Sequence, residues 1–182
     1  MIRFIEKKDV EAVYNIYKYY ILNTSITFEI AVPTIEDFAI RIKNISKTHP
    51  YIVYELDNKV IGYAYATPYG DRQAYMWTLT STIYVHHKYL NKGIGKILYK
   101  QLLELLKTQG FHTVFAIITS TNNNSMKFHL NIGFKYQFTL DNMGYKLGNW
   151  HDIIFYRYEI SSPTNPPNSL ISIEEVKILK KV

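Results

Sequence analysis

The stretch that decides the fold is IYVHHKYLNKGIGKIL, residues 83–98. It begins as an apolar strand-type segment, passes through Gly93 and Gly95, and continues into apolar positions 97, 98, 102, 105 and 106, a helical stripe that ends at Gly110. Glycines let a backbone approach a ligand closely, and a helix N-terminus offers unpaired N–H groups. We therefore expect a phosphate site at this turn, although an ordinary strand-to-helix connection has the same pattern.

Charge supports a small phosphorylated ligand more than a nucleic acid. The chain of 182 residues carries a formal net charge of +6. Lysines surround the glycine turn at positions 88, 92, 96 and 100, and the sequence has no run of five basic residues. A dinucleotide-binding fold is disfavoured, because the third glycine of its motif would fall at Leu98.

Composition narrows the class further. With 47% hydrophobic and 20% charged residues the chain should fold around one core. The absence of cysteine excludes a disulfide framework, a thiolate zinc site and a cysteine nucleophile, and the six histidines have no metal-ligand spacing, so we expect no metal. No run of eighteen apolar residues and no signal-peptide core are present. We expect a soluble, cytoplasmic protein that binds neither membrane nor nucleic acid.

The remaining periodicities predict the elements around the decisive stretch. Asp9 should cap a helix that reaches Ile21, and Thr34 and Asp37 should cap a second helix that runs to about Ser46. Further helices are predicted at 95–109 and 125–131, and strands at 2–5, 51–56, 59–66, 74–85, 112–118, 134–140 and 152–159. This order predicts an α+β or mixed α/β fold. Residues 161–168 are typical of a linker, so we divide the chain into a domain at 1–160 and a peripheral tail at 161–182, with one short strand or helix in 171–182.

Several spaced motifs, taken with residues 83–98, resemble the GNAT family of N-acetyltransferases, and within it the phosphinothricin N-acetyltransferase branch. They are Asn23-Thr-Ser-Ile-Thr-Phe28, Gly62-Tyr-Ala-Tyr-Ala66, Arg72-Gln-Ala-Tyr75-Met-Trp77-Thr78, Tyr84-Val85, Asn122-x-x-Ser125, His129-Leu-Asn-Ile-Gly-Phe134 and Gly144-Tyr-Lys-Leu-Gly-Asn-Trp150-His-Asp152. The resemblance covers residues 1–160. It implies a central, twisted, mixed but mostly antiparallel sheet flanked by helices, with acetyl-CoA as co-substrate and a homodimeric assembly.

The resemblance also assigns residues to the coenzyme. It implies that the thioester lies beside the backbone of Ile83, Tyr84 and Val85, where this strand diverges from the strand at 112–118. The pyrophosphate would rest on the N–H groups of the turn, and two polar residues would meet the pantetheine arm. The implied coenzyme residues of the turn are Asn91, Lys92, Gly93, Ile94, Gly95 and Lys96, and those of the arm are Asn122 and Ser125.

On the acceptor side the resemblance implies a small amino acid or analogue, of the phosphinothricin or methionine sulfoximine type. Phe28, Glu29, Arg72 and Tyr75 fall at acceptor-binding positions, and an arginine can grip a carboxylate or phosphinate with two N–H groups. Tyr75 is equally consistent with a core aromatic in a tyrosine-rich sheet. His129 falls where relatives place a catalytic group, and an imidazole that titrates near neutrality can donate to the coenzyme thiolate; the alternative is a helix-surface histidine bonded to a nearby carbonyl.

Two positions depart from the family pattern. Relatives carry a general-base glutamate where this chain has Thr80, which cannot act as a base near neutral pH. A water chain held by Thr80 and Ser81, or another carboxylate such as Glu29, would have to remove the amine proton; Glu29 is otherwise a solvated loop carboxylate. Leu90 replaces the Gln or Arg that normally starts the pyrophosphate loop, which should weaken coenzyme binding without abolishing it.

Three functions follow from these observations. The leading one is acetyl transfer from acetyl-CoA to a small amine. The second is an acyl-CoA-binding pseudoenzyme that has lost its base at Thr80. The third, a nucleic-acid-binding protein, rests only on the basic charge.

Overall fold

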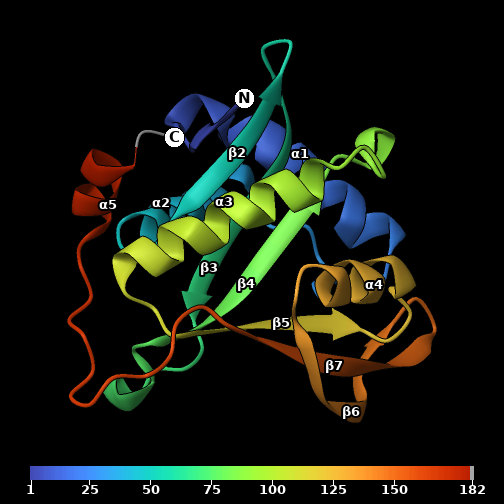
Figure 1. Cartoon of the computed structure of the whole chain (residues 1–182). Helices are drawn as coiled ribbons and strands as arrows, with labels where there is room; N and C mark the ends of the chain where they lie inside the picture. The colour runs from blue at the N-terminus through green and yellow to red at the C-terminus, as the bar shows by residue number, and fades with distance from the viewer. Residues whose placement is uncertain (181–182) are drawn as a thin grey trace.

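A seven-stranded sheet with the order β1-β2-β3-β4-β5-β7-β6 organises the part of the chain that the structure describes, residues 1–180 (Figure 1). In this computed structural model the strands are β1 (Ile2–Phe4), β2 (Tyr51–Leu56), β3 (Lys59–Pro68), β4 (Thr78–Val85), β5 (Thr113–Thr119), β6 (Lys135–Lys146) and β7 (Asn149–Glu159). Neighbours are antiparallel except β4 and β5, which are parallel. The predicted mixed, mostly antiparallel sheet is confirmed.

Helices cover both faces of the sheet, and the sheet separates two hydrophobic clusters. The helices are α1 (Val10–Asn23), α2 (Ile35–Ser46), α3 (Ile94–Gln109), α4 (Asn123–Asn131) and α5 (Ile173–Leu179). In the view of Figure 1, α3 crosses in front of β2, β3 and β4, whereas α1 and α2 lie behind them. Leu98, Leu102 and Leu106 of α3 are fully buried in the larger cluster, and Val13 of α1 and Phe38 of α2 belong to the smaller one. The sheet is therefore a partition with a separate core on each side.

The predicted helix caps differ in outcome. Thr34 Oγ1 accepts a hydrogen bond from the Asp37 N–H at 3.1 Å, which confirms that cap. Asp9 precedes α1 but does not cap it, because its buried carboxylate accepts two hydrogen bonds from Arg3, at 2.6 and 2.8 Å, and one from the Glu6 N–H at 2.8 Å. The ion pair with β1 has taken the place of the expected helix cap.

Some strand boundaries differ from the predicted ones, because backbone pairing and not the side-chain pattern sets them. The strand predicted from residue 74 begins at Thr78, and Gln73–Tyr75 form a 3-10 turn, because β3 ends at Pro68 and the ladder between β3 and β4 ends with it. The last two strands are longer than predicted. They meet at Leu147 and Gly148, whose φ angles of 52° and 79° form a tight two-residue hairpin turn.

The segment after residue 160 packs more closely than a peripheral tail should. Ile173 and Val176 of α5 are 1% and 0% exposed in the larger cluster, and the α5 N-terminus is capped reciprocally by Ser172 and Glu175. The Trp77 indole N–H also donates to the Asn168 carbonyl at 2.8 Å. A boundary at 160 stays a prediction, and residues 181 and 182 of the predicted tail lie outside the described residues. Over residues 1–180, no helix is both long and apolar enough to cross a membrane.

Candidate active site

A split in the sheet lies beside the decisive stretch. β4 and β5 pair through only three residue pairs, from Thr78 with Thr113 to Thr80 with Phe115. Beyond that point β4 pairs only with β3 and β5 only with β7 among the described strands. The strands therefore diverge as predicted, and the β4 backbone from Ser81 to Val85 turns one edge toward an opening.

The turn after β4 presents backbone N–H groups to this opening. Asn91 and Gly93 have positive φ angles of 60° and 77°, and Gly93 is the residue immediately before α3. Glycine adopts this left-handed conformation without a Cβ penalty, and asparagine tolerates it better than most residues. Successive N–H groups in such a turn form a concave anion-binding surface, reinforced by the positive end of a sixteen-residue helix.

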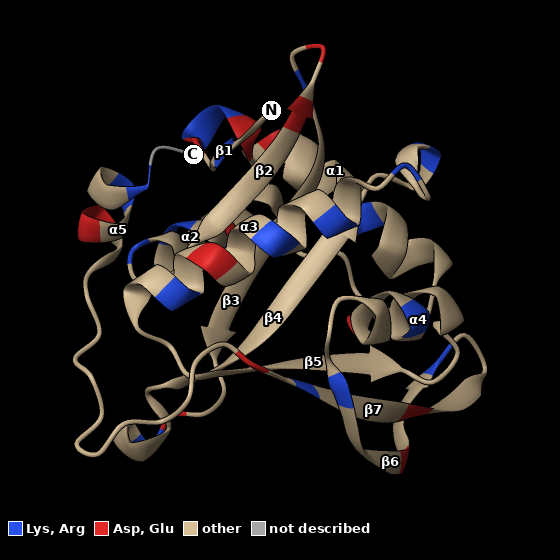
Figure 2. Ribbon diagram, viewed as in Figure 1, with Lys and Arg blue, Asp and Glu red and all other residues tan. Residues whose placement is uncertain are grey.

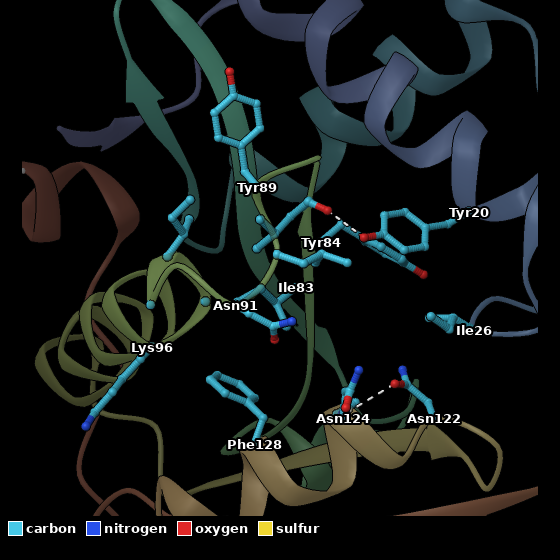
Figure 3. Close-up of a pocket in the computed structure, with 16 residues that line it drawn as sticks. Tyr20, Ile26, Ile83, Tyr84, Tyr89, Asn91, Lys96, Asn122, Asn124 and Phe128 are labelled. Atoms are coloured by element: carbon cyan, nitrogen blue, oxygen red, sulfur yellow. Dashed lines mark hydrogen bonds between the residues drawn. The ribbon is translucent and has the colours of Figure 1, made fainter. Parts of the chain in front are cut away.

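A cavity of about 290 Å³ joins the turn, the diverging strand and α4 (Figure 3). Ten of the eleven predicted coenzyme residues line it: Ile83, Tyr84, Val85, Asn91, Gly93, Ile94, Gly95, Lys96, Asn122 and Ser125. Lys92 does not line it, because its ammonium group lies 5.0 Å above the centre of the Tyr89 ring. The predicted residues thus converge on one cavity, with a single exception.

Five further lining residues were missed by sequence reasoning: Tyr20, Ile26, Tyr89, Asn124 and Phe128. Leu90, which the resemblance placed at the start of the pyrophosphate loop, lines the cavity as well. Tyr20 lies on α1, far from the glycine turn in sequence, and belongs to none of the motifs that marked the site. Its hydroxyl donates to the Val85 carbonyl at 2.5 Å, and burial raises its pKa to about 12, which keeps the phenol protonated as a donor (Figure 3). Tyr20 thereby ties α1 to the diverging end of β4.

Lysines lie on the outer side of the same region. Lys88, Lys92, Lys96 and Lys100 are all exposed, and Figure 2 shows basic residues along the solvent-facing side of α3. The Lys96 side chain lines the cavity with its base and extends away from it in Figure 3. These charges attract an anion to the cavity mouth more than they contact one inside it.

His129 lies in the interior, not on the helix surface. It is 3% exposed and lines a second cavity of about 110 Å³ together with Ser81, Thr82 and Ile83 of β4. The Ser125 carbonyl can only accept a hydrogen bond, so Nδ1, 2.8 Å away, carries the proton and Nε2 does not. Burial lowers the His129 pKa from 6.5 to about 4, against the opposing effect of that hydrogen bond. The expectation that this imidazole titrates near neutrality is therefore wrong, and a neutral His129 accepts hydrogen bonds at Nε2.

The Thr80 hydroxyl forms its hydrogen bond within the sheet. Its hydroxyl lies 2.9 Å from the Thr67 hydroxyl on β3, and it lines neither of the two cavities. The neighbouring Ser81 hydroxyl is hydrogen-bonded to the Tyr99 hydroxyl of α3 and, at 3.2 Å, donates to the Phe115 carbonyl. The two hydroxyls thus point to opposite sides of β4, which does not favour a single water chain held by both.

The segment between α1 and α2 carries two of the four predicted acceptor residues. Residues 24–29, which we call the acceptor loop, place Phe28 against Gly144 of β6 and Glu29 beside Arg41 of α2. One Glu29 oxygen is paired with Arg41, and the other, Oε2, is buried without a hydrogen-bond partner among the described residues. Glu29 is thus a partly solvated loop carboxylate, with a side chain 31% exposed and one buried oxygen.

Arg72 and Tyr75 lie apart from this loop. Both are exposed on the turn between β3 and β4, where Tyr75 packs edge-on against Tyr69. Arg72 lines a separate open cavity of about 600 Å³ near Gln109 and the residues preceding α5. Within the described chain no hydrogen bond or aromatic contact joins either residue to Phe28 or Glu29. Across residues 1–180, no cluster of three His, Cys, Asp or Glu side chains suits a metal ion.

Fold and cavity together define a mixed α/β protein with a split sheet, whose cavity lies beside a helix N-terminus of the kind that suits an anion. Comparison with known proteins narrows this class. The chain belongs to the acetyltransferase (GNAT) domain family, whose model matches residues 2–155.

Named relatives and solved structures extend the match over most of the chain. A phosphinothricin N-acetyltransferase of Streptomyces viridochromogenes is 34% identical over 91% of this chain and 91% of its own length. An L-methionine sulfoximine/L-methionine sulfone acetyltransferase of Salmonella typhimurium is 28% identical over 91% of this chain and 97% of its own. A phosphinothricin acetyltransferase from Sinorhizobium meliloti, solved in complex with AcCoA, superposes with a TM-score of 0.87, at 28% identity, over 95% of this chain and 97% of that one.

Proposed function

We propose that this protein transfers the acetyl group of acetyl-CoA to the amine of a small amino acid or analogue, of the phosphinothricin or methionine sulfoximine and sulfone type. The observation that carries the proposal is the split between β4 and β5 with the glycine turn at its mouth. The names of the relatives support both the reaction and the acceptor class. They give no support to a pseudoenzyme.

The chemistry divides between the two sides of the split. The coenzyme pyrophosphate is held by N–H groups of residues 91–96, and the thioester extends along β4. Attack by a neutral amine places negative charge on the thioester oxygen, which backbone N–H groups of β4 on the open edge stabilise. The carbon–sulfur bond then breaks, the amide forms, and the coenzyme A thiolate takes up the proton that the amine has lost, so that it leaves as the thiol.

The amine proton requires an acceptor other than Thr80. Two groups qualify: Glu29, a carboxylate with one buried unpaired oxygen, and His129, a neutral imidazole in the cavity beside β4. We favour His129 as the acceptor for a water that carries the proton, since it lines the split and Glu29 is engaged with Arg41. The proposed roles are thus a proton acceptor at His129 and acceptor binding at Phe28 and Glu29, with Arg72 and Tyr75 contributing from the turn between β3 and β4.

The decisive experiment is a thiol-release assay with acetyl-CoA and a panel of amino acids that includes phosphinothricin and methionine sulfoximine. Release with at least one member supports the proposal; tight coenzyme binding without release on any member would overturn it. The Thr80→Glu variant separates the readings: a large gain in turnover would indicate a lost base, and unchanged turnover indicates that another group already serves.

We also propose a cytoplasmic homodimer. Aromatic rings run from Tyr75 and Tyr69 through Phe115 and Phe155 to Phe138 on one face of the sheet, where Phe138 is 44% exposed. Exposed aromatic surface of this extent on an edge strand suits a second copy of the chain. Sedimentation should give a dimer that Phe138→Glu converts to a monomer; a monomeric wild-type chain at micromolar concentration would refute this assembly.

A further inference from the structure

The acceptor loop is held in place from the other end of the domain. Lys146, the last residue of β6, donates a hydrogen bond from Nζ to the Thr27 carbonyl at 2.8 Å, across 119 positions of sequence. The lysine is only 5% exposed. Thr27 is itself buried, and its hydroxyl lies 2.9 Å from the Tyr17 hydroxyl of α1. The hairpin of β6 and β7 therefore grips the loop in which Phe28 and Glu29 follow Thr27.

Gly144 makes the second contact of this grip. A Cβ placed on Gly144 would lie 2.4, 2.6 and 2.8 Å from three atoms of the Phe28 ring, closer than packed carbon atoms approach. A rigid ring cannot yield locally as a flexible side-chain end could, so any residue larger than glycine must displace Phe28. Gly144 pairs with His151 across the hairpin, and the His151 ring lies 6.3 Å from that of Phe28.

Burial of the Lys146 ammonium group costs free energy that an apolar side chain of similar size would not. Removing an ammonium group from water is unfavourable unless hydrogen bonds and charges compensate, and an apolar side chain would avoid that cost. The described structure gives the Lys146 ammonium one hydrogen bond, to Thr27, and Glu29 is the carboxylate that attracts it. The charge is thus directed at the acceptor loop, and loop position is the property it controls.

We infer that Gly144 and Lys146 of the β6–β7 hairpin are positioning residues that set the place of Phe28 and Glu29, and thereby determine which acceptor fits. The inference rests on the proposed function, because it assigns the loop to the acceptor. Neither residue lines the 290 Å³ cavity, and Ile26 is the one residue of the acceptor loop that does, so the hairpin acts mainly on acceptor recognition.

Steady-state kinetics of Gly144→Ala and Lys146→Met test the inference, with Lys135→Met, an exposed lysine of the same strand, as the matched control. We expect the acceptor KM to rise about ten- to a hundredfold, as misplaced substrate contacts do, with a much smaller change in the KM for acetyl-CoA, because only Ile26 of the loop lines the coenzyme cavity. In a Phe28→Ala background, Gly144→Ala should add nothing further, because the ring it displaces is gone. An undiminished effect in that background would overturn the role of Gly144.

Hydrogen exchange provides a readout that does not depend on turnover. In Lys146→Met the amides of residues 24–30 should exchange faster, while those of α3 keep the wild-type rate; Lys135→Met should change neither. Unchanged exchange in the loop together with an unchanged acceptor KM would refute the inference. If the wild-type enzyme transfers acetyl to no acceptor, the proposed function fails, and the exchange experiment still decides whether the hairpin holds the loop.

Discussion

The buried imidazole of His129 should make the stability of the protein depend on pH in a defined window. Its pKa is lowered from 6.5 to about 4 in the folded state. Between these values the unfolded chain binds a proton that the folded chain does not, so stability is present above pH 6.5 and is lost as the pH falls toward 4.

The size of the effect follows from the two pKa values. The full shift of 6.5 to about 4 corresponds to about 3 kcal/mol of unfolding free energy. Between pH 7 and pH 5 the two titration curves give a loss of about 2 kcal/mol. This interval is convenient, because ordinary carboxylates stay largely ionised at pH 5.

Urea denaturation of the wild type and of His129→Gln at pH 7 and pH 5 isolates this group from the others that titrate. The wild type should lose about 2 kcal/mol more than the variant between the two pH values, with equal denaturant slopes. Equal losses in both proteins would refute the assignment of a neutral, desolvated imidazole.

Three further perturbations address the turn, the sheet and the tail. Gly93→Ala places a Cβ on a residue with a φ of 77° and should weaken coenzyme A binding about tenfold, whereas Gly93→Asn should bind nearly as tightly as the wild type. Calorimetric titration compares the three proteins. Equal affinities for the wild type and both variants would contradict the backbone explanation. Thr80→Val removes the hydrogen bond to Thr67 and should cost about 1 kcal/mol of stability without changing turnover, so a tenfold slower variant would return Thr80 to the proton path. Val176→Ala should cost about 2 kcal/mol in urea denaturation with coenzyme affinity unchanged, and no loss would mean that α5 does not stabilise the core.

Sequence patterns predicted what local physics determines. The apolar period after Gly95 and the stop at Gly110 predicted α3 to within one residue, because amphipathic spacing and a left-handed glycine act within a few turns of helix. The same holds for the cap at Thr34. The glycine turn located the coenzyme cavity for a similar reason: the residues that form it are neighbours in the chain.

Sequence patterns could not predict contacts between segments that are distant in the chain. The diversion of Asp9 to Arg3 and of Lys92 to Tyr89 depends on where other side chains arrive. The depressed pKa of His129 depends on packing that encloses α4, and Lys146 would be read from sequence as an ordinary surface lysine on an edge strand. Family motifs marked several of these positions as special without indicating what each one touches.

The three-pair seam between β4 and β5 has a consequence for the order of folding. Three residue pairs contribute little stability of their own. The segment that follows β7 passes Trp77, and its residues Ile173 and Val176 are buried in the larger hydrophobic cluster. Docking of this segment brings together residues that are far apart in the sequence, and contacts of that kind form slowly. Refolding kinetics of Val176→Ala test this order, because the substitution should mainly accelerate unfolding if α5 docks after the rate-limiting barrier.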